Sequence, residues 1–214
     1  MVTSKSWNWE IVEDNIWNTP SEDSYYYLDR WKNKKYKNFL DLGCGLGRHS
    51  ILFAKNGFNI YSFDLSEYGI SKVMEVSENQ NLDINTMVGD ILNLPYQDNY
   101  FDCLLSYHVI SHTDSKGILA ILSEIKRVLK SDGEFLITLC SKNSLNFQSG
   151  IYPKIDENTI VKTEEPEKGI PHFYVNYDEV KSLVSMFEII RIRHIQDFSN
   201  EKSTWNYFIH GKKK

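Results

Sequence analysis

The sequence contains little that is typical of a membrane, secreted or nucleic-acid-binding protein. No apolar run approaches the roughly 20 residues that a membrane-spanning helix needs. The chain has only 3 cysteines, Cys44, Cys103 and Cys140, and their odd number and unpaired spacing indicate neither a disulfide framework nor a zinc site. Its 24 Lys and Arg residues are outnumbered by 29 Asp and Glu residues, so no basic excess indicates a nucleic-acid partner.

These absences favour a cytoplasmic protein with reduced thiols. The first ten residues, MVTSKSWNWE, lack the apolar core of a signal peptide. At 214 residues the chain is long enough for a single domain, residues 1–214, with a full core. We expect no membrane and no nucleic-acid partner, and the acidic, unpatterned surface predicts a monomer or weak homodimer.

Strand-like and helix-like patterns alternate between residues 37 and 140. Short apolar runs predict strands at 38–42, 58–63, 84–88, 101–107 and 134–139. Helices are predicted at 48–56 and 118–129, where apolar residues recur at helical spacing, and at the polar segment 67–80. Because the strands are continuously apolar, they are typical of parallel strands that are covered on both faces. We therefore expect an α/β fold in which helices cover both faces of a parallel sheet.

A glycine-rich segment, FLDLGCGLG at 39–47, follows directly from the first predicted strand. Glycine at 43, 45 and 47 allows unusual main-chain dihedrals and a close approach of the main chain to a ligand. In open α/β sheets, ligands bind beyond the carboxyl ends of the strands. The segment therefore predicts a site for a nucleotide-like cofactor.

The residues around this loop help to identify the cofactor. A dinucleotide-binding G-x-G-x-x-G pattern needs glycine at position 48, which is Arg48, so a nicotinamide dehydrogenase is disfavoured. Asp41 precedes the loop, Asp64 ends the second predicted strand, and Asp90 follows the third. A carboxylate at the position of Asp64 can accept hydrogen bonds from ribose hydroxyls. Acids beside the loop suit a cofactor with an amino group, an adenosine and a positive charge.

The chain resembles the class I S-adenosylmethionine-dependent methyltransferases. Five segments carry the resemblance, in order: LDLGCGLG, FDLS at 63–66, GDILNLPY at 89–96, FDCLLSYHVISH at 101–112 and LKSDGEFLI at 129–137. The resemblance implies a Rossmann-like three-layer sandwich. Its seven-stranded, mostly parallel sheet has an antiparallel last strand, which residues 181–214 supply. It also implies S-adenosyl-L-methionine as the cofactor. The later part of the chain resembles a small-molecule-acting, tellurite-resistance-like subgroup.

The resemblance also implies a set of cofactor-binding residues. Asp41, Gly43, Cys44 and Gly45 are expected to hold the methionine part, and Asp64 the ribose. The adenine and methionyl contacts are expected from Leu65, Asp90, Ile91, Ser106 and Tyr107. Each has a purely structural alternative; Asp90, for example, also suits the N-cap of a short turn.

Methyl transfer from a sulfonium is a direct displacement, so orientation supplies much of the rate. A base is required only if the acceptor must lose a proton. No catalytic residue is identified, but His108, His172 and Tyr174 are candidates. His108 and His112 lie four residues apart, a spacing that can bind metal, but without a helix or a third ligand we expect no metal site.

Two segments are expected to cover the site. The N-terminal region 1–36 contains WNWEIVEDNIWNTPSEDSYYYLDRW, and its aromatic helix, opened by a capping box at Thr19–Glu22, predicts a helical lid. Residues 141–176 show little periodicity and follow the fifth strand. So long a loop is usually functional or disordered. We expect this insertion to cap the acceptor site.

The sequence as a whole predicts methyl transfer to a small-molecule acceptor whose reacting atom stays open. A nucleic-acid or protein methyltransferase is one alternative. Base-methylating relatives carry Asn or Asp followed by Pro-Pro and an aromatic residue after the fourth strand, where this chain has Ser106, Tyr107, His108 and Val109. A second alternative is a protein that binds S-adenosylmethionine without catalysis, because fold does not dictate function.

Overall fold

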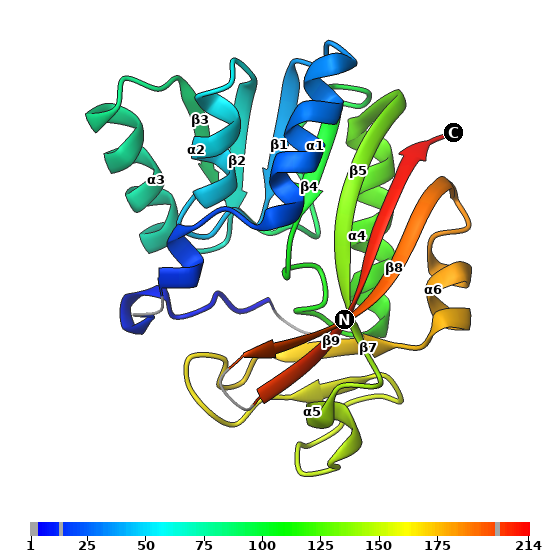
Figure 1. Cartoon of the computed structure of the whole chain (residues 1–214). Helices are drawn as coiled ribbons and strands as arrows, with labels where there is room; N and C mark the ends of the chain where they lie inside the picture. The colour runs from blue at the N-terminus through cyan, green and yellow to red at the C-terminus, as the bar shows by residue number, and fades with distance from the viewer. Residues whose placement is uncertain (1–3, 13–14, 200–201) are drawn as a thin grey trace.

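The computed structural model describes residues 4–12, 15–199 and 202–214, and a twisted sheet lies at its centre (Figure 1). Its parallel strands are β1 (Asn38–Leu42), β2 (Asn59–Asp64), β3 (Ile84–Val88), β4 (Phe101–Ser106) and β5 (Leu129–Ser141), in the order β3-β2-β1-β4-β5. Strand β9 (Lys202–Lys213) pairs antiparallel with both β5 and β8 (Phe187–Ser199). These seven strands confirm the expected mostly parallel sheet with an antiparallel last strand.

Helices cover both faces of this sheet, which confirms the three-layer arrangement. On one face, α1 (Glu22–Asn33) and α2 (Arg48–Ala54) bury a shared aromatic cluster, and α3 (Glu67–Asn79) packs beside α2. In that cluster the rings of Phe39 and Phe53 stack with centroids 4.1 Å apart. On the other face lie α4 (Ser115–Val128) and α6 (Tyr177–Leu183). The apolar residues of α4 recur every three or four positions, so one side of the helix is buried.

The insertion after β5 contains more regular structure than its sequence indicates. It forms α5 (Leu145–Gln148), β6 (Thr159–Val161) and β7 (Pro171–Val175). Strand β7 pairs in parallel with the end of β5, and β6 pairs antiparallel with β7. The expectation of seven strands and an irregular insertion was therefore incomplete. All five residues of β7 are buried, so the strand shows no apolar–polar alternation by which the sequence could reveal it.

Helix α1 packs on the sheet through a buried carboxylate. Glu134 of β5 is fully buried and accepts two hydrogen bonds from Arg30, at 2.8 and 2.7 Å, and one from the Trp31 indole at 2.9 Å. Lys34 forms a further ion pair with it at 2.7 Å. The predicted capping box is absent here, because Ser21 is the N-cap but makes no side-chain cap bond. Its hydroxyl instead lies 3.1 Å from the His49 ring.

The chain before α1 crosses the carboxyl-end edge of the sheet as an extended segment with two short turns of 3₁₀ helix, η1 (Trp9–Ile11) and η2 (Asn15–Asn18). Residues 1–3 and 13–14 of the expected N-terminal lid region lie outside the described residues. Among the described helices, none is long and apolar enough to cross a membrane.

Candidate functional site

The glycine loop between β1 and α2 explains why three glycines follow the first strand. Gly43, Gly45 and Gly47 have φ values of +75°, +54° and +82°, which other residues rarely adopt. A Cβ at Gly43 would lie only 2.2 Å from the Val109 side chain. The Gly43 amide donates to the carbonyl oxygen of Phe63 at 2.7 Å, which fixes the loop against the end of β2. Both dihedral angles and space therefore require glycine here.

Two of the predicted acids, Asp64 and Asp90, line the cavity beside the loop. One Asp64 carboxylate oxygen accepts a hydrogen bond from the Gly45 amide at 2.8 Å, and the other accepts one from the Ser66 amide at 2.8 Å. Burial raises the pKa of Asp64, and these two amides oppose the rise. Asp90 accepts a hydrogen bond from the Leu92 amide at 2.9 Å, so it caps a turn and also borders the cavity.

The loop and acids line one cavity, and most of the predicted cofactor-binding residues meet there. The expected residues that line it are Gly43, Cys44, Gly45, Asp64, Leu65, Asp90, Ile91, Tyr107 and His108. They come from the carboxyl ends of β1, β2, β3 and β4. Sequence segments up to 65 residues apart thus converge because parallel strands end at the same edge of the sheet.

Asp41 and Ser106 are the two predicted cofactor residues that do not border this cavity. The Asp41 carboxylate accepts hydrogen bonds from the amide and hydroxyl of Ser50 at 2.9 and 2.6 Å. Burial raises the pKa of Asp41 to about 6, although the two hydrogen bonds from Ser50 act to lower it. The Ser106 hydroxyl donates to the carbonyl oxygen of Leu42 at 2.8 Å. In this conformation both side chains form hydrogen bonds with residues that flank the glycine loop, and neither borders the cavity.

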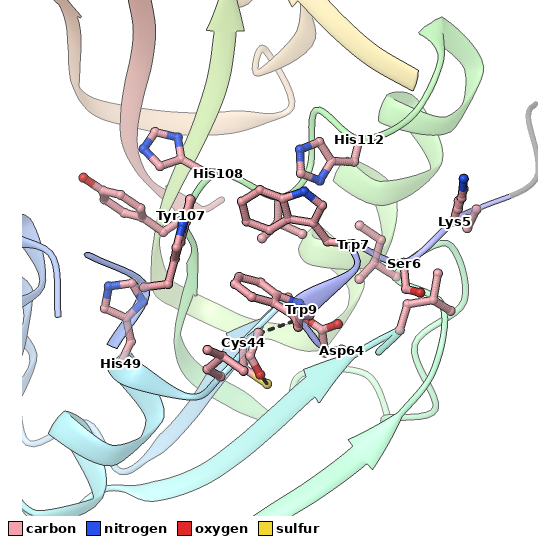
Figure 2. Close-up of a pocket in the computed structure, with 18 of the residues that line it drawn as sticks. Lys5, Ser6, Trp7, Trp9, Cys44, His49, Asp64, Tyr107, His108 and His112 are labelled. Atoms are coloured by element: carbon pink, nitrogen blue, oxygen red, sulfur yellow. Dashed lines mark hydrogen bonds between the residues drawn. The ribbon is translucent and has the colours of Figure 1, made fainter. Parts of the chain in front are cut away.

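Tryptophans of the N-terminal segment cover the glycine loop, and they were not among the predicted site residues. The Trp9 ring lies so close to Gly45 that an added Cβ would come within 2.6 Å of it. Trp7 and Trp17 contact Trp9 edge-on, with centroids 4.6 and 5.6 Å away. Figure 2 shows Trp9 next to Cys44 and Trp7 beyond it. The aromatic density of WNWEIVEDNIW was the available signal, but the sequence did not show which rings turn inward.

Arg48 anchors this segment to the start of α2. Its guanidinium donates to the main-chain oxygens of Ile16 and Thr19 at 2.6 and 3.2 Å. It also lies 5.1 Å from the Trp17 ring centroid and 5.7 Å from that of Tyr107, within the range of cation–π attraction. By contrast, Tyr25 and Tyr26 of the predicted lid helix are exposed, and Tyr27 and Trp31 are buried against the sheet.

A second and larger cavity adjoins the first. Its volume is about 970 Å³, against about 90 Å³ for the cavity at the glycine loop. His172 and Tyr174, both predicted from the sequence, line this larger cavity from β7. The residues that line both cavities are Trp7, Trp17, Arg48, Tyr107, His108 and His112. The two spaces therefore share one wall.

Two histidines of this region, His108 and His49, are held in the neutral form. Burial, helped by the nearby Arg48 charge, lowers the pKa of His108 to about 4. Burial likewise lowers the pKa of His49 to about 3, and its Nε2 accepts a hydrogen bond from the Ser21 amide at 3.2 Å. Neutral His108 on the shared wall has a ring nitrogen that can accept a proton, and its pKa of about 4 makes it a weak base at neutral pH. His49 was missed, because nothing in its helical sequence context distinguishes it.

Comparison with known proteins identifies a domain within the chain. Residues 40–137 match the family model described as a methyltransferase domain. Norajmaline N-methyltransferase from Rauvolfia serpentina is 32% identical over 133 residues, which cover 61% of this chain and 44% of that protein. The probable S-adenosyl-L-methionine-dependent methyltransferase TehB from Haemophilus influenzae is 34% identical over 98 residues, or 46% of this chain and 34% of TehB. The chain spans about half the length of the curated relatives that it matches first.

Solved structures share the fold over nearly the whole chain. The crystal structure of TehB from H. influenzae aligns with a TM-score of 0.69 at 21% identity, covering 91% of this chain and 63% of that one. The 1,6-didemethyltoxoflavin-N1-methyltransferase from Burkholderia thailandensis, solved with 1,6-didemethyltoxoflavin and S-adenosylhomocysteine, gives 0.66 at 15% identity, covering 90% and 77%. Residues 40–137, which carry the glycine loop and the acids, are thus similar to a methyltransferase domain, and nearly the whole chain shares the fold of these S-adenosylmethionine-dependent methyltransferases.

Proposed function

We propose that this chain transfers a methyl group from S-adenosyl-L-methionine to a small-molecule acceptor. The observation that carries the proposal is the pair of adjoining cavities. One lies against the glycine loop, the other is walled by the insertion, and the two share a wall. The larger cavity lies within the roughly 300–1,000 Å³ of ordinary small-molecule sites. The related proteins are named for an alkaloid and for a toxoflavin precursor, which also favours a small acceptor.

The residues that line the cavity at the glycine loop suit the cofactor chemically, but in this conformation the cavity is too small to hold it. The glycine cradle leaves space that side chains would fill, and the Asp64 carboxylate stands at its wall. Its volume of about 90 Å³ is well below that of ordinary small-molecule sites, and Trp9 presses on the loop. The proposal therefore includes movement: the segment that carries Trp7, Trp9 and Trp17 opens to admit the cofactor and then covers it.

The residues of the cavity take distinct roles in this proposal. Asp64 accepts hydrogen bonds from the ribose hydroxyls. Leu65 and Ile91 pack on the adenine, and Asp90 faces its amino group. The glycine loop and Cys44 hold the methionine portion. These assignments follow the family pattern, and the position of each side chain on the cavity wall supports them.

The cofactor supplies an electrophilic methyl group on a positively charged sulfur, which moves to the acceptor by direct displacement. The chain's part is to hold the acceptor atom in line with that methyl group and to exclude water. Tyr107 and Trp7 on the shared wall present aromatic faces, which favour positive charge. Neutral His108, on the same wall, takes the acceptor proton where one must leave.

Calorimetric titration with S-adenosylmethionine and S-adenosylhomocysteine tests the cofactor, followed by an acceptor screen that measures S-adenosylhomocysteine formation. We expect micromolar binding of both and turnover with one class of small acceptor. No binding to the folded chain would sink the proposal. Binding without turnover on any small acceptor, and turnover on RNA or protein, would replace it with the alternative functions.

A pair of variants separates the two cavities. Asp64→Asn alters only the cavity at the glycine loop, whereas Asn146→Trp narrows the larger cavity from α5. We expect the first to weaken cofactor binding. The second should raise the acceptor KM and leave the cofactor Kd within about twofold. If Asn146→Trp left every kinetic constant unchanged, the larger cavity would not be the acceptor site.

A further inference from the structure

Three potential metal ligands meet at the wall of the larger cavity. Ligand atoms of His112, Glu167 and His172 all lie within 4.8 Å of one another. His112 lies in the loop after β4, and the other two lie in or just before β7. All three line the larger cavity. The sequence offered no such site, because its third ligand is 55 residues away from His112.

Main-chain hydrogen bonds hold these ligands together. The Phe173 amide, next to His172, donates to the carbonyl oxygen of Ser111, next to His112, at 2.7 Å. The Ser111 hydroxyl accepts a hydrogen bond from the Cys140 amide at 3.0 Å, which ties the same loop to β5. The loop that carries His112 is therefore tied to β7 and β5 by hydrogen bonds, so the positions of His112 and His172 do not depend on flexible side chains alone.

The hydrogen bonds of His172 need an explanation. Its Nδ1 lies 3.1 Å from the carbonyl oxygen of Ile170, and its Nε2 lies 2.9 Å from a carboxylate oxygen of Glu167. Both partners are acceptors, but a neutral imidazole has only one N–H. Either His172 is doubly protonated, or Nδ1–H donates to Ile170 and the Nε2 lone pair faces a cation that Glu167 shares. The second pattern is how metal-ligating histidines are usually held, with the other ring nitrogen donating to a carbonyl.

His112 brings a second imidazole close to His172 and Glu167. Its ring packs edge-on against His172 with centroids 4.7 Å apart. In the described part of the chain no hydrogen bond joins the ring nitrogens of His112 to another residue, although its main-chain amide donates to the carbonyl oxygen of Val109 at 2.9 Å. Figure 2 shows His112 beside Trp7, and their ring centroids are 6.5 Å apart.

We propose that His112, His172 and Glu167 bind a divalent first-row transition-metal ion, with Zn²⁺ as the reference ion. Two imidazoles and one carboxylate are a recurrent catalytic ligand set that leaves coordination positions open. Bonds of about 2.0–2.2 Å require ligand atoms roughly 3–3.5 Å apart, so the side chains close slightly around the ion. Lys162 lies 3.6 Å from the second Glu167 oxygen, and its charge opposes the metal.

This site would also define the acceptor class, a consequence that rests on the proposed methyltransferase function. Because the three ligands line the larger cavity, an ion held by them would lie at its wall and would suit an acceptor with an ionisable hydroxyl or thiol. A bound divalent ion lowers the pKa of such a group. The acceptor proton leaves to neutral His108, the acceptor atom bonds to the methyl carbon, and the carbon–sulfur bond of the sulfonium breaks with its electron pair retained on sulfur.

Metal binding is tested on the full chain after chelator treatment, without cofactor or acceptor. Calorimetric titration with Zn²⁺ should give one site of micromolar or tighter Kd, and titration with Co²⁺ should give visible bands of a low-coordinate ion. Glu167→Gln and His112→Gln should each weaken Zn²⁺ binding at least tenfold. Lys162→Met should strengthen it. His194→Gln, a histidine outside the cluster, is the matched control and should bind as the wild type does.

The outcomes separate this proposal from the proposed function. Wild-type protein without a stoichiometric Zn²⁺ site, or equal binding by wild type and both ligand variants, would overturn the metal site and leave a His172–Glu167 ion pair. Lys162→Met retains all three ligands, so a tightened Kd for that variant supports the site even if a ligand variant unfolds. Cofactor binding is measured separately with S-adenosylhomocysteine, so a failed metal site leaves the methyltransferase proposal intact, and the reverse also holds.

Discussion

Replacing Asp64 by Asn tests the geometry of the cofactor cavity most directly. The carboxylate of Asp64 accepts hydrogen bonds from the amides of Gly45 and Ser66, both at 2.8 Å, and is proposed to accept the ribose hydroxyls. An Asn side chain has one acceptor oxygen, and its NH₂ group faces a donor. Hydrogen bonds to charged groups contribute about 1.5–3 kcal/mol. Losing one such bond on binding should therefore weaken the affinity roughly 10- to 150-fold.

Calorimetric titration with S-adenosylhomocysteine measures this loss, because the product binds without turnover. Asp83→Asn is the matched control: it makes the same change at an exposed position before β3 and should keep the wild-type Kd. Urea unfolding of each variant checks that the fold is retained. A Kd for Asp64→Asn within threefold of the wild type, in a folded protein, would refute the role assigned to this carboxylate.

Three further predictions follow from other contacts. Because Trp9 lies on the glycine loop, S-adenosylhomocysteine should change tryptophan fluorescence with the calorimetric Kd; an unchanged spectrum at saturation would contradict the proposed cover. Removing the Glu134 carboxylate in Glu134→Leu should cost about 1–3 kcal/mol in urea unfolding, because it leaves the buried Trp31 indole N–H without an acceptor and takes the partner from the half-buried Arg30, whereas Glu188→Gln at an exposed pair should cost less than 1 kcal/mol. His49 has a pKa of about 3 in the folded chain, against about 6.5 for a histidine in an unfolded chain. As the pH falls below about 6.5, the unfolded chain therefore binds a proton at His49 and the folded chain does not, so the free energy of unfolding decreases. Wild-type stability should thus fall by about 2 kcal/mol more than that of His49→Gln between pH 7.5 and 5; parallel curves would show that His49 titrates normally.

Local patterns in the sequence were enough to predict several parts of this protein. Apolar runs and helical periodicity predict the strands and helices up to β5 because burial on one or both faces leaves its period in the residues. The three glycines predict the loop because only glycine adopts those dihedrals freely. Asp64 and Asp90 could be placed at the site because the ends of parallel strands share one edge.

The contacts between side chains of distant segments could not be predicted in this way and became visible in the folded chain. The tertiary structure placed Trp9 of the N-terminal segment on Gly45, turned Asp41 away from the cavity toward Ser50, and brought His112 beside Glu167. It also showed that α1 packs on the sheet and that the insertion adds two strands. These arrangements depend on packing and strand pairing between residues dozens of positions apart, and such contacts leave no local period or fixed spacing in a single sequence.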